Sequence, residues 1–454
     1  MALKPDTKAA ANPTKTFFVR MITRDISLED CILDLIDNSV DGAWKCEGSK
    51  PVGLADGADL QKYKIEIEAS ADGFRITDNC GGMSLAEAAG HAFSFGRQAT
   101  DATDDYSIGV YGIGMKRAVF KLGEDIRVRS TYAEEGGEAL SFAVPIKVDQ
   151  WLVNDTPPWD FDIEEDAALA EPGVEILVHS LTVGASTSFG NPAFLQNLKR
   201  TIARDYSLHL ARGLTVVLNG ETIQGWKIEL RQGDEFAAMR VEYQDEAEGA
   251  PVAVEIIGGM AAPPPDDIEP DEDDEGDKRF GWYVVCNGRI VLAADKTSVA
   301  GWGTDGWPQW HRQYSGFMGV ILFTSANAAS LPLTTTKRSV DVSSEVYRRA
   351  RPSMRDVTRK WIDYTNARKQ ASDEAKQKEA AAVAVSIQQI PRLQTVLLPT
   401  LVTKPREKVA NVSYSVPLVR LKKLGTALGN INMAYRDVGL KSFEYTFDDL
   451  VGEE

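Results

Sequence analysis

The sequence contains few of the residues that build zinc sites and disulfide frameworks. Among 454 residues there are four cysteines and four histidines. The cysteines, Cys31, Cys46, Cys80 and Cys286, are scattered and form no C-x-x-C pair. This spacing argues against a zinc site and a disulfide framework, so we expect a fold that depends on an ordinary hydrophobic core.

Long hydrophobic segments are also absent. No apolar run approaches the roughly 18 residues that a membrane-spanning helix needs, and the first residues lack the apolar region of a secretory signal. We therefore expect no membrane partner and a cytoplasmic location. A chain of 454 residues, 43 % hydrophobic and 26 % charged, is long enough for two or three folded domains.

Positive charge is scarce overall but concentrated towards the C-terminus. The net charge is −17, yet residues 337–436 carry 20 Lys and Arg against 8 Asp and Glu. A polyanion such as DNA would be repelled by most of the chain and attracted by this part of it. A solvated helix surface explains the same residues equally well, and both interpretations stay open at this point.

The order of the predicted elements favours an α+β fold. Period-two alternation and turn residues indicate strands at 16–22 (a strand or a strap), 64–68, 74–77, 126–131, 140–148, 174–179, 281–286 and 317–323. Helices are expected from Ser27 to about Trp44, from near Met115, over 192–211, and from Ser343 to about 385 with an interruption at Pro352.

Carboxylates and an amide follow one face of the first long helix. Asp30, Asp34, Asn38 and Asp41 are spaced by three or four residues, with apolar residues on the opposite side. The amide oxygen of Asn38 can ligate Mg²⁺, and the carboxylate of Asp34, one turn away, can orient an attacking water. A solvated polar face is the alternative.

A carboxylate also follows a predicted strand at a glycine turn. Asp78 stands at the end of the strand, and Gly81, Gly82 and Met83 come after it. Glycines let the backbone pass close to a ligand, and an acceptor-only carboxylate suits the exocyclic amine of adenine. Taken alone, this segment also fits an ordinary Asp-Asn turn.

A third segment is a glycine-rich loop that leads into a helix. Its candidate phosphate-binding residues are Gly109, Gly112, Ile113, Gly114, Met115 and Lys116. Such a loop offers several N–H groups and the positive end of a helix dipole to an anion. Lys116 and Arg117 would add positive charge or face solvent. The loop lacks the G-K-[ST] ending of a Walker A loop, and its glycine spacing differs from a Rossmann fingerprint.

Together the three segments resemble the GHKL (Bergerat-fold) ATPases, which include the ATPase subunit of DNA gyrase, MutL, the heat-shock chaperone ATPases and the MORC ATPases. The family patterns E-x-x-x-N-x-x-D, D-x-G-x-G and G-x-x-G-x-G match, in that order, Asp34, Asn38 and Asp41; Asp78 and Gly82; and Gly109, Gly112 and Gly114. The resemblance is greatest to bacterial MORC-like proteins. It implies ATP and Mg²⁺ as ligands and an ATP lid at 94–107.

The resemblance also assigns a role to a lysine much later in the chain. In gyrase-like and MutL-like proteins a transducer-domain lysine reaches the γ-phosphate, and Lys337 stands in the corresponding order. A basic loop residue is the alternative. The resemblance further implies an ATP-dependent homodimer, formed through the lid and the N-terminal strap.

Four regions follow from this comparison. We expect a Bergerat α/β sandwich that binds ATP at 1–190, a transducer-like β-α-β domain at 191–345 with a disordered acidic insertion at 263–278, a long helical segment at 346–395, and a small C-terminal interaction module at 396–454. Within this last module, basic helical stretches around 418–424 and after Gly429 could form a helix–turn–helix.

Two functions remain open. The first is a slow ATPase in which Asp34 and Lys337 are catalytic and ATP-driven dimerisation acts as a clamp. Asp34 replaces the family's Glu, and retracting a carboxylate by about 1 Å can cost on the order of 100-fold in rate. The second is a non-hydrolysing, nucleotide-sensing scaffold that recruits a protein effector. DNA is the leading candidate client, and the likeness to bacterial MORC-like proteins suggests a setting in genome defence.

Overall fold

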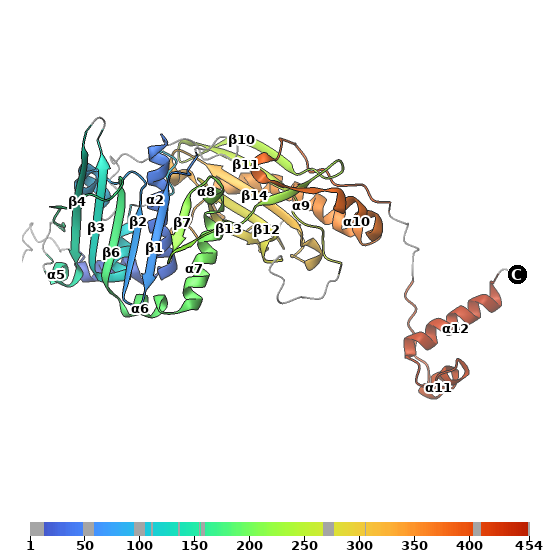
Figure 1. The fold of residues 1–454 in the computed structure, drawn as a ribbon. Coiled ribbons are helices and arrows are strands. Elements are labelled where there is room, and N and C mark those ends of the chain that lie inside the picture. The colour runs from blue at the N-terminus through green and yellow to red at the C-terminus, as the bar shows by residue number, and fades with distance from the viewer. Residues whose placement is uncertain are drawn as a thin grey trace, which may run out of the picture. The chain divides into compact units, whose positions relative to one another are not determined.

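The computed structural model describes residues 13–48, 59–94, 105–109, 112–134, 137–153, 155, 159–266, 277–304, 306–402 and 410–452. The chain divides into two compact units, Met1–Thr403 and Lys404–Glu454. The fold is mixed α+β, as predicted, with two large sheets in the first unit and two helices in the second (Figure 1).

An eight-stranded sheet forms the first half of the larger unit. Its strand order is β5-β4-β3-β6-β2-β1-β7-β8. The strands are β1 (Lys64–Ser70), β2 (Gly73–Asp78), β3 (Gly123–Ala133), β4 (Ala139–Lys147), β5 (Glu164–Glu165), β6 (Gly173–Leu181), β7 (Thr215–Leu218) and β8 (Glu221–Thr222). Neighbouring strands are antiparallel except β1 and β7, which are parallel. Side chains of β1 alternate strictly between exposed and buried, because one face of the sheet is covered.

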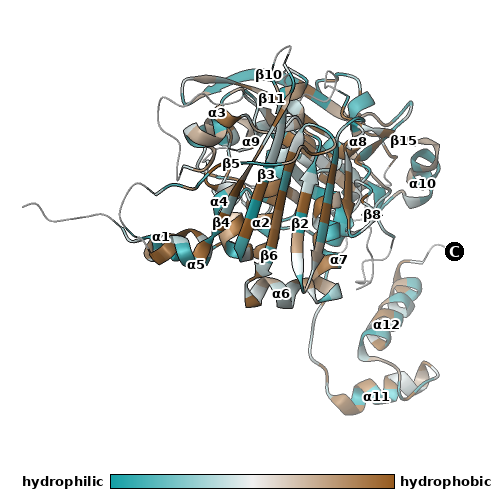
Figure 2. Cartoon of the chain, turned by 60° about the vertical axis from the view of Figure 1, so that its left-hand side comes forward, coloured by the Kyte–Doolittle hydropathy of each residue, from teal (hydrophilic) through white to brown (hydrophobic). Residues whose placement is uncertain are grey.

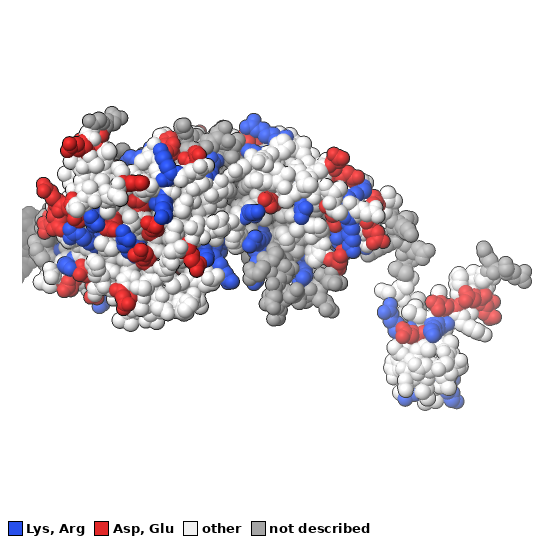
Figure 3. Space-filling model, viewed as in Figure 1, with Lys and Arg blue, Asp and Glu red and all other residues white. Residues whose placement is uncertain are grey.

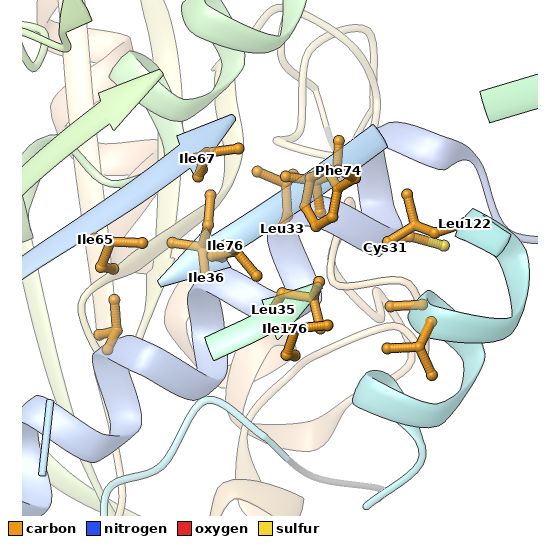
Figure 4. Close-up of a cluster of buried hydrophobic side chains, with 14 of the residues drawn as sticks. Cys31, Leu33, Leu35, Ile36, Ile65, Ile67, Phe74, Ile76, Leu122 and Ile176 are labelled. Atoms are coloured by element: carbon orange, nitrogen blue, oxygen red, sulfur yellow. The ribbon is translucent and has the colours of Figure 1, made fainter. Parts of the chain in front are cut away.

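The helices of this half are α1 (Lys15–Arg24), α2 (Leu28–Cys46), α3 (Leu85–Glu87), the π-helical turn η1 (Ala88–Ala92), α4 (Gly114–Leu122), α5 (Val148–Val153), α6 (Val183–Phe189), α7 (Pro192–Asp205) and α8 (Ser207–Ala211). Buried side chains of α2, α4 and α7 belong to the same hydrophobic core as those of the sheet. Apolar side chains of α2 point towards those of β1 and β2 (Figure 4). Along β2 and β6 in the centre of the sheet, hydrophobic and polar residues are interspersed (Figure 2).

A five-stranded sheet forms the core of the second half. Its order is β10-β11-β14-β12-β13. The strands are β10 (Met239–Ala247), β11 (Ala250–Met260), β12 (Gly281–Cys286), β13 (Arg289–Asp295) and β14 (Phe317–Thr324). Every residue of β12 and β14 is buried, since one cluster of apolar side chains, including those of α9 (Glu345–Arg368), covers one face and a second cluster covers the other. This arrangement explains why these strands are continuous apolar runs in the sequence.

Short elements complete the first unit. They are β9 (Glu229–Gln232), the 3-10 turns η2 (Asp277–Arg279), η3 (Arg312–Tyr314), η4 (Ala328–Ser330) and η5 (Ile387–Gln389), α10 (Ser372–Ala381) and β15 (Val383–Ser386). The strands predicted at 64–68, 74–77, 126–131, 140–148, 174–179, 281–286 and 317–323 are confirmed.

The predicted strand at 16–22 is wrong, because these residues belong to helix α1. The Thr14 side chain accepts a hydrogen bond from the Phe17 N–H at 3.2 Å and caps the helix. Val19 and Ile22 pack against the core, whereas Phe17 and Met21 are exposed. The burial therefore follows a helical spacing, which a short apolar run does not reveal by itself.

The predicted long helix from Ser343 to about 385 is also wrong in detail. Helix α9 continues through Pro352, which has no N–H to donate, because buried residues such as Ala350 and Met354 anchor it on the sheet. The helical region ends instead at α10, and the following Val383–Ser386 forms β15, which pairs with β9. Strand β9 lies about 150 residues before β15, so no local sequence pattern predicts this pairing.

The strands that follow residue 190 bear on the predicted domain limits. β7 and β8 extend the first sheet, and buried residues up to Ile223 belong to its core. Residues 267–276 of the acidic insertion lie outside the described residues. The division of the chain into four regions stays a prediction.

The second unit contains α11 (Leu418–Ala427) and α12 (Tyr435–Leu450). Gly425 and Val438 are its buried residues within these helices. Among the residues that the structure describes, no helix is long and apolar enough to cross a membrane.

Candidate functional site

Helix α2 presents a carboxylate and an amide to the same cavity. The Ser27 side chain accepts a hydrogen bond from the Asp30 N–H at 3.0 Å, as the sequence predicts, and caps the helix. Residues 31–40 are buried except Asn38, which is exposed within this run. Asn38 lines the cavity together with Asp34, so its amide oxygen is available to a ligand.

Asp78, at the end of β2, lines the same cavity and contacts α2. One carboxylate oxygen accepts from the Ser39 hydroxyl at 2.6 Å, and the other from the N–H groups of Cys80 (2.9 Å) and Val174 (3.2 Å). Burial raises the pKa of Asp78 even though these hydrogen bonds lower it. The carboxylate is thus fixed in orientation, and since each oxygen has two lone pairs, the one bonded to Ser39 can still accept from an amine.

The glycine turn after Asp78 brings the backbone against a neighbouring strand. Gly82 has φ +73°, and a Cβ built on it would lie 2.0 Å from the Thr131 carbonyl oxygen. The N–H of the next residue, Met83, donates a hydrogen bond to the Ser130 hydroxyl at 2.7 Å. The Met83 carbonyl accepts a hydrogen bond from the same hydroxyl at 2.8 Å. Only glycine fits at position 82, which leaves Met83 lining the cavity.

The glycine-rich loop is held by Asp41. Its carboxylate accepts from the N–H groups of Ile108 (2.7 Å) and Gly109 (3.0 Å). Burial raises the pKa of Asp41 to about 7, the two backbone hydrogen bonds lower it, and the Asp37 charge raises it. Asp41 therefore positions the loop that leads towards the N-terminus of α4.

Helix α4 begins at Gly114, which lies against the side chain of Asp34. A Cβ built on Gly114 would lie 3.3 Å from the Asp34 carboxyl carbon. Lys116 and Arg117 are both buried, so the alternative that they face solvent is wrong. Lys116 donates to the carbonyls of Ala92, at 2.8 Å, and Gly112. Arg117 donates instead to Asp34.

A lysine from the second half of the first unit reaches the same place. Lys337, which is buried and has φ +55°, donates to Asp34 at 3.2 Å and to Asp37 at 2.8 Å. The other oxygen of Asp34 accepts from Arg117 at 2.7 and 2.6 Å. Burial lowers the pKa of Lys337, but the Asp37 and Asp34 charges outweigh it and raise the pKa above the ordinary value. The lysine therefore remains a cation.

One cavity of about 250 Å³ collects all of these groups. Every site residue expected from the sequence lines it: Asp34, Asn38, Asp41, Asp78, Gly82, Met83, Gly109, Gly112, Ile113, Gly114, Met115, Lys116 and Lys337. Val110 and Tyr111, and residues 95–104 of the expected lid at 94–107, lie outside the described residues.

The sequence analysis missed several groups of this site. Ser39 orients Asp78, and Arg117, which the sequence indicated only as a possible positive charge, pairs with Asp34. Asp37 is fully buried and pairs with Lys337 and with Arg289 of β13. Asp37 lies three residues after Asp34 on the same helix, so its spacing was a usable signal. Arg289 had no such signal, because only the tertiary structure brings β13 to α2.

The side-chain oxygens that line this cavity fit a Mg²⁺ ion that is held partly by phosphates. They fit a metal site built from protein ligands alone less well. Among the described residues no group of three or more His, Cys, Asp or Glu side chains could hold a metal ion. Mg²⁺ in nucleotide sites usually takes only one or two protein oxygens and completes its shell with phosphate and water. Asn38 lies close to the loop and can supply such an oxygen.

Comparison with known proteins agrees with this geometry. Residues 26–169 match the family described as "Histidine kinase-, DNA gyrase B-, and HSP90-like ATPase". The match includes the helix, the carboxylate turn and the glycine loop, but not Lys337. No curated protein matches the chain. The matched segment and its cavity together identify residues 26–169 as a GHKL-like ATP-binding and ATPase domain.

Proposed function

We propose that the protein hydrolyses ATP slowly and uses the nucleotide to control the association of its N-terminal domains. The observation that carries this proposal is the cavity itself, which brings three separate segments of the first domain together with Lys337. A matched domain alone could bind a nucleotide without sensing its γ-phosphate. A buried lysine from outside the matched segment supplies a group that can distinguish ATP from ADP.

The two ends of the cavity suit the two ends of ATP. Asp78 accepts from the adenine amine at one end, while Gly109, Gly112 and Gly114 offer N–H groups at the other. Asn38 would hold Mg²⁺, which supplies charge neutralisation at the phosphates when bound. Asp34 and Lys337 then flank the position of the γ-phosphate, with Asp34 orienting water and Lys337 stabilising charge.

The bonding of Asp34 supports slow turnover. Both of its oxygens accept from cations, Arg117 on one and Lys337 on the other. Both oxygens are therefore directed at these cations, and Asp34 can turn towards an attacking water only when one of them moves. The same observation favours the alternative function, a nucleotide-sensing scaffold that recruits a protein partner and does not hydrolyse ATP.

Phosphate release distinguishes the two functions. We expect the purified chain to release phosphate from ATP slowly and only with Mg²⁺, and Asp34→Ala to remove this release while ATP still binds. Lys337→Met should also lower it. If the wild-type chain releases phosphate no faster than Asp34→Ala, the nucleotide-sensing scaffold is the function.

Dimerisation follows from the same proposal. We expect a non-hydrolysable ATP analogue, but not ADP, to convert the chain into a homodimer, measured by light scattering during size-exclusion chromatography. An unchanged monomer mass across protein concentrations would contradict the clamp. Lys337→Met is the matched variant, since it should bind the analogue without dimerising.

DNA is the client that we propose, with a protein effector as the alternative. Arg348, Arg355 and Arg359 are exposed along α9, opposite its buried residues. Elsewhere on the visible face of the first unit, positive and negative side chains are interspersed (Figure 3). Contact with DNA would therefore be local. It should weaken steeply between low and moderate salt in fluorescence anisotropy.

Acidic residues of the insertion oppose this contact. Asp266 pairs with Arg368 at 3.1 Å and with Lys376 at 3.0 Å. Deleting 266–277 should therefore strengthen DNA binding, while charge reversal at Arg355 and Arg359 should weaken it. Absence of binding at low salt in every nucleotide state, including for the deletion, would transfer the proposal to a protein partner.

A further inference from the structure

A buried carboxylate beside the cavity is shared by both halves of the first unit. Asp37 accepts from the Tyr206 hydroxyl at 2.6 Å, from Lys337 at 2.8 Å and from Arg289. Its side chain is fully buried, and it does not line the cavity, whereas Lys337 does. Asp37 therefore cannot touch a nucleotide directly, and Lys337 is the cavity-lining residue to which it is hydrogen-bonded.

The charges of this network are unequal in number. Two carboxylates, Asp34 and Asp37, face three cations, Arg117, Arg289 and Lys337. Burial raises the pKa of Asp37, but Arg289 and Lys337 lower it more, so it stays ionised. These five groups carry one positive charge in excess, and two further carboxylates interact with them, Asp205 with Arg289 and Asp41 with Lys337.

Of the three cations, Lys337 is the one that both carboxylates share. If it moves to an anion in the cavity, Asp34 keeps Arg117 and Asp37 keeps Arg289 as its own partner. If either arginine moved instead, its carboxylate would keep only the shared lysine, and a partly compensated buried charge is costly. The pairing pattern therefore marks Lys337 as the exchangeable cation.

Arg289 belongs to a hairpin that contacts the site at a second point. Cys286 pairs with Arg289, so Asn287 and Gly288 form the tight turn between β12 and β13. The Asn287 side chain donates to the Ser107 carbonyl at 2.9 Å, and Ser107 lines the cavity at the start of the glycine-rich loop. The turn is thereby attached to the nucleotide domain at two points, Ser107 through Asn287 and Asp37 through Arg289.

We propose that Asp37 is the acceptor that holds Lys337 when no γ-phosphate is bound, and that Arg289 is the positioning residue that makes Lys337 releasable from it. Asp37 and the γ-phosphate compete for one lysine. Arg289 weakens the hold of Asp37 by sharing its charge. The preference of the site for ATP over ADP is then determined by a pair that does not contact the nucleotide. This inference rests on the proposed function.

Two substitutions should shift that preference in opposite directions. Asp37→Asn removes the competitor, so we expect the affinity ratio of an ATP analogue over ADP to rise about tenfold. Arg289→Gln leaves Asp37 with Lys337 as its one cation, so the same ratio should fall about tenfold. A role in folding alone would lower the affinity for both nucleotides together, and the ratio would not move.

The test uses calorimetry of the full chain with ADP and with adenylyl-imidodiphosphate, each with Mg²⁺. Asp37→Asn is repeated in a Lys337→Met background, where we expect no further change, because the effect passes through the lysine. Asp30→Asn is the matched control. Asp30 lies about two turns before Asp37 on the same helix, pairs with Arg338 and does not line the cavity. If a single variant fails to fold, Asp37→Asn with Arg289→Gln removes both charges, and its ratio should rise as for Asp37→Asn.

The outcomes are distinct. An unchanged ratio in both single variants, or in the double variant where a single one does not fold, overturns the inference while the proposed function stands. A shift that persists undiminished in the Lys337→Met background also overturns it. A wild-type chain that binds neither nucleotide overturns the proposed function and the inference with it.

Discussion

The side-chain nitrogen of Lys337 lies 3.2 Å from a carboxylate oxygen of Asp34, although the two residues are 303 positions apart in the chain. Asp34 belongs to the helix that lines the cavity, whereas Lys337 belongs to a loop beyond the second sheet. The neighbouring Arg338 pairs with Asp30 and with Glu29 of the same helix. The second half of the first unit is thus held to α2 by ion pairs, and one of them is inside the nucleotide cavity.

Removing the adenine acceptor should weaken nucleotide binding. Asp78→Asn replaces a carboxylate that is fixed by Ser39 and by two N–H groups, and a hydrogen bond to a charged group contributes about 1.5–3 kcal/mol. We expect a loss of about tenfold to 100-fold in affinity for ATP and for ADP alike, measured by calorimetry. Asp72→Asn, in the exposed turn before β2, is the control and should bind like wild type.

Removing the amide should have a different effect. Asn38→Ala takes away the oxygen expected to ligate Mg²⁺, so the stimulation of ATP binding by Mg²⁺ should disappear while binding in EDTA is unchanged. Titrations with and without the metal separate these contributions. Equal stimulation by Mg²⁺ in wild type and variant would contradict the assignment of Asn38.

Lengthening the carboxylate at position 34 should speed hydrolysis. Asp34→Glu adds the methylene that the related ATPases have and moves the carboxylate by about 1 Å, a displacement that can change a rate by on the order of 100-fold. We expect phosphate release at least tenfold faster than wild type, with ATP affinity changed much less. Phosphate release at the wild-type rate, with normal affinity, would contradict the assignment of Asp34 as the group that orients water.

The backbone at Gly82 should tolerate no side chain. Alanine there would need φ +73° and would bring its Cβ to 2.0 Å from the Thr131 carbonyl oxygen. We expect Gly82→Ala to destabilise the first unit by about 2 kcal/mol or more and to abolish ATP binding. Gly90→Ala is the control, because a Cβ at Gly90 meets nothing within 4 Å. Thermal unfolding of both variants checks the difference.

Stability should depend on pH through Asp41. Its pKa is raised to about 7, above the ordinary value of 3.8, so between these pH values the folded state binds a proton that the unfolded state has released. Stability from this group is therefore present at low pH and is lost as pH rises towards 7. Asp41→Asn cannot titrate. Relative to this variant, the wild type should lose about 2–3 kcal/mol between pH 5 and pH 8 in denaturant unfolding.

A constant difference between wild type and Asp41→Asn across this range would contradict that prediction. Comparing the two proteins removes the contribution of all other titrating groups, provided they are unaffected by the substitution. The variant should also keep the loop in place, because an Asn oxygen can accept from the Ile108 or Gly109 N–H.

The sequence alone determined the local parts of this site. Ser27 and the spacing of Asp34, Asn38 and Asp41 predicted a capped helix with one polar face, and the alternation of 64–68 and 74–77 predicted the hairpin that delivers Asp78. These features depend on residues within a few positions of each other, where backbone geometry repeats with a fixed period. The expected site residues consequently line one cavity.

Tertiary structure alone decided which charges meet. Arg117 and Lys116 carried no sign of being buried, and Arg289 and Tyr206 were unremarkable in sequence, yet they converge on Asp34 and Asp37 or the loop beside them. The same holds for β15, whose partner strand is remote, and for α1, whose periodicity was too short to read. Pairing between distant segments depends on the packing of the whole unit. A buried charge is costly without an opposite charge nearby, and only the fold determines which residue supplies that charge.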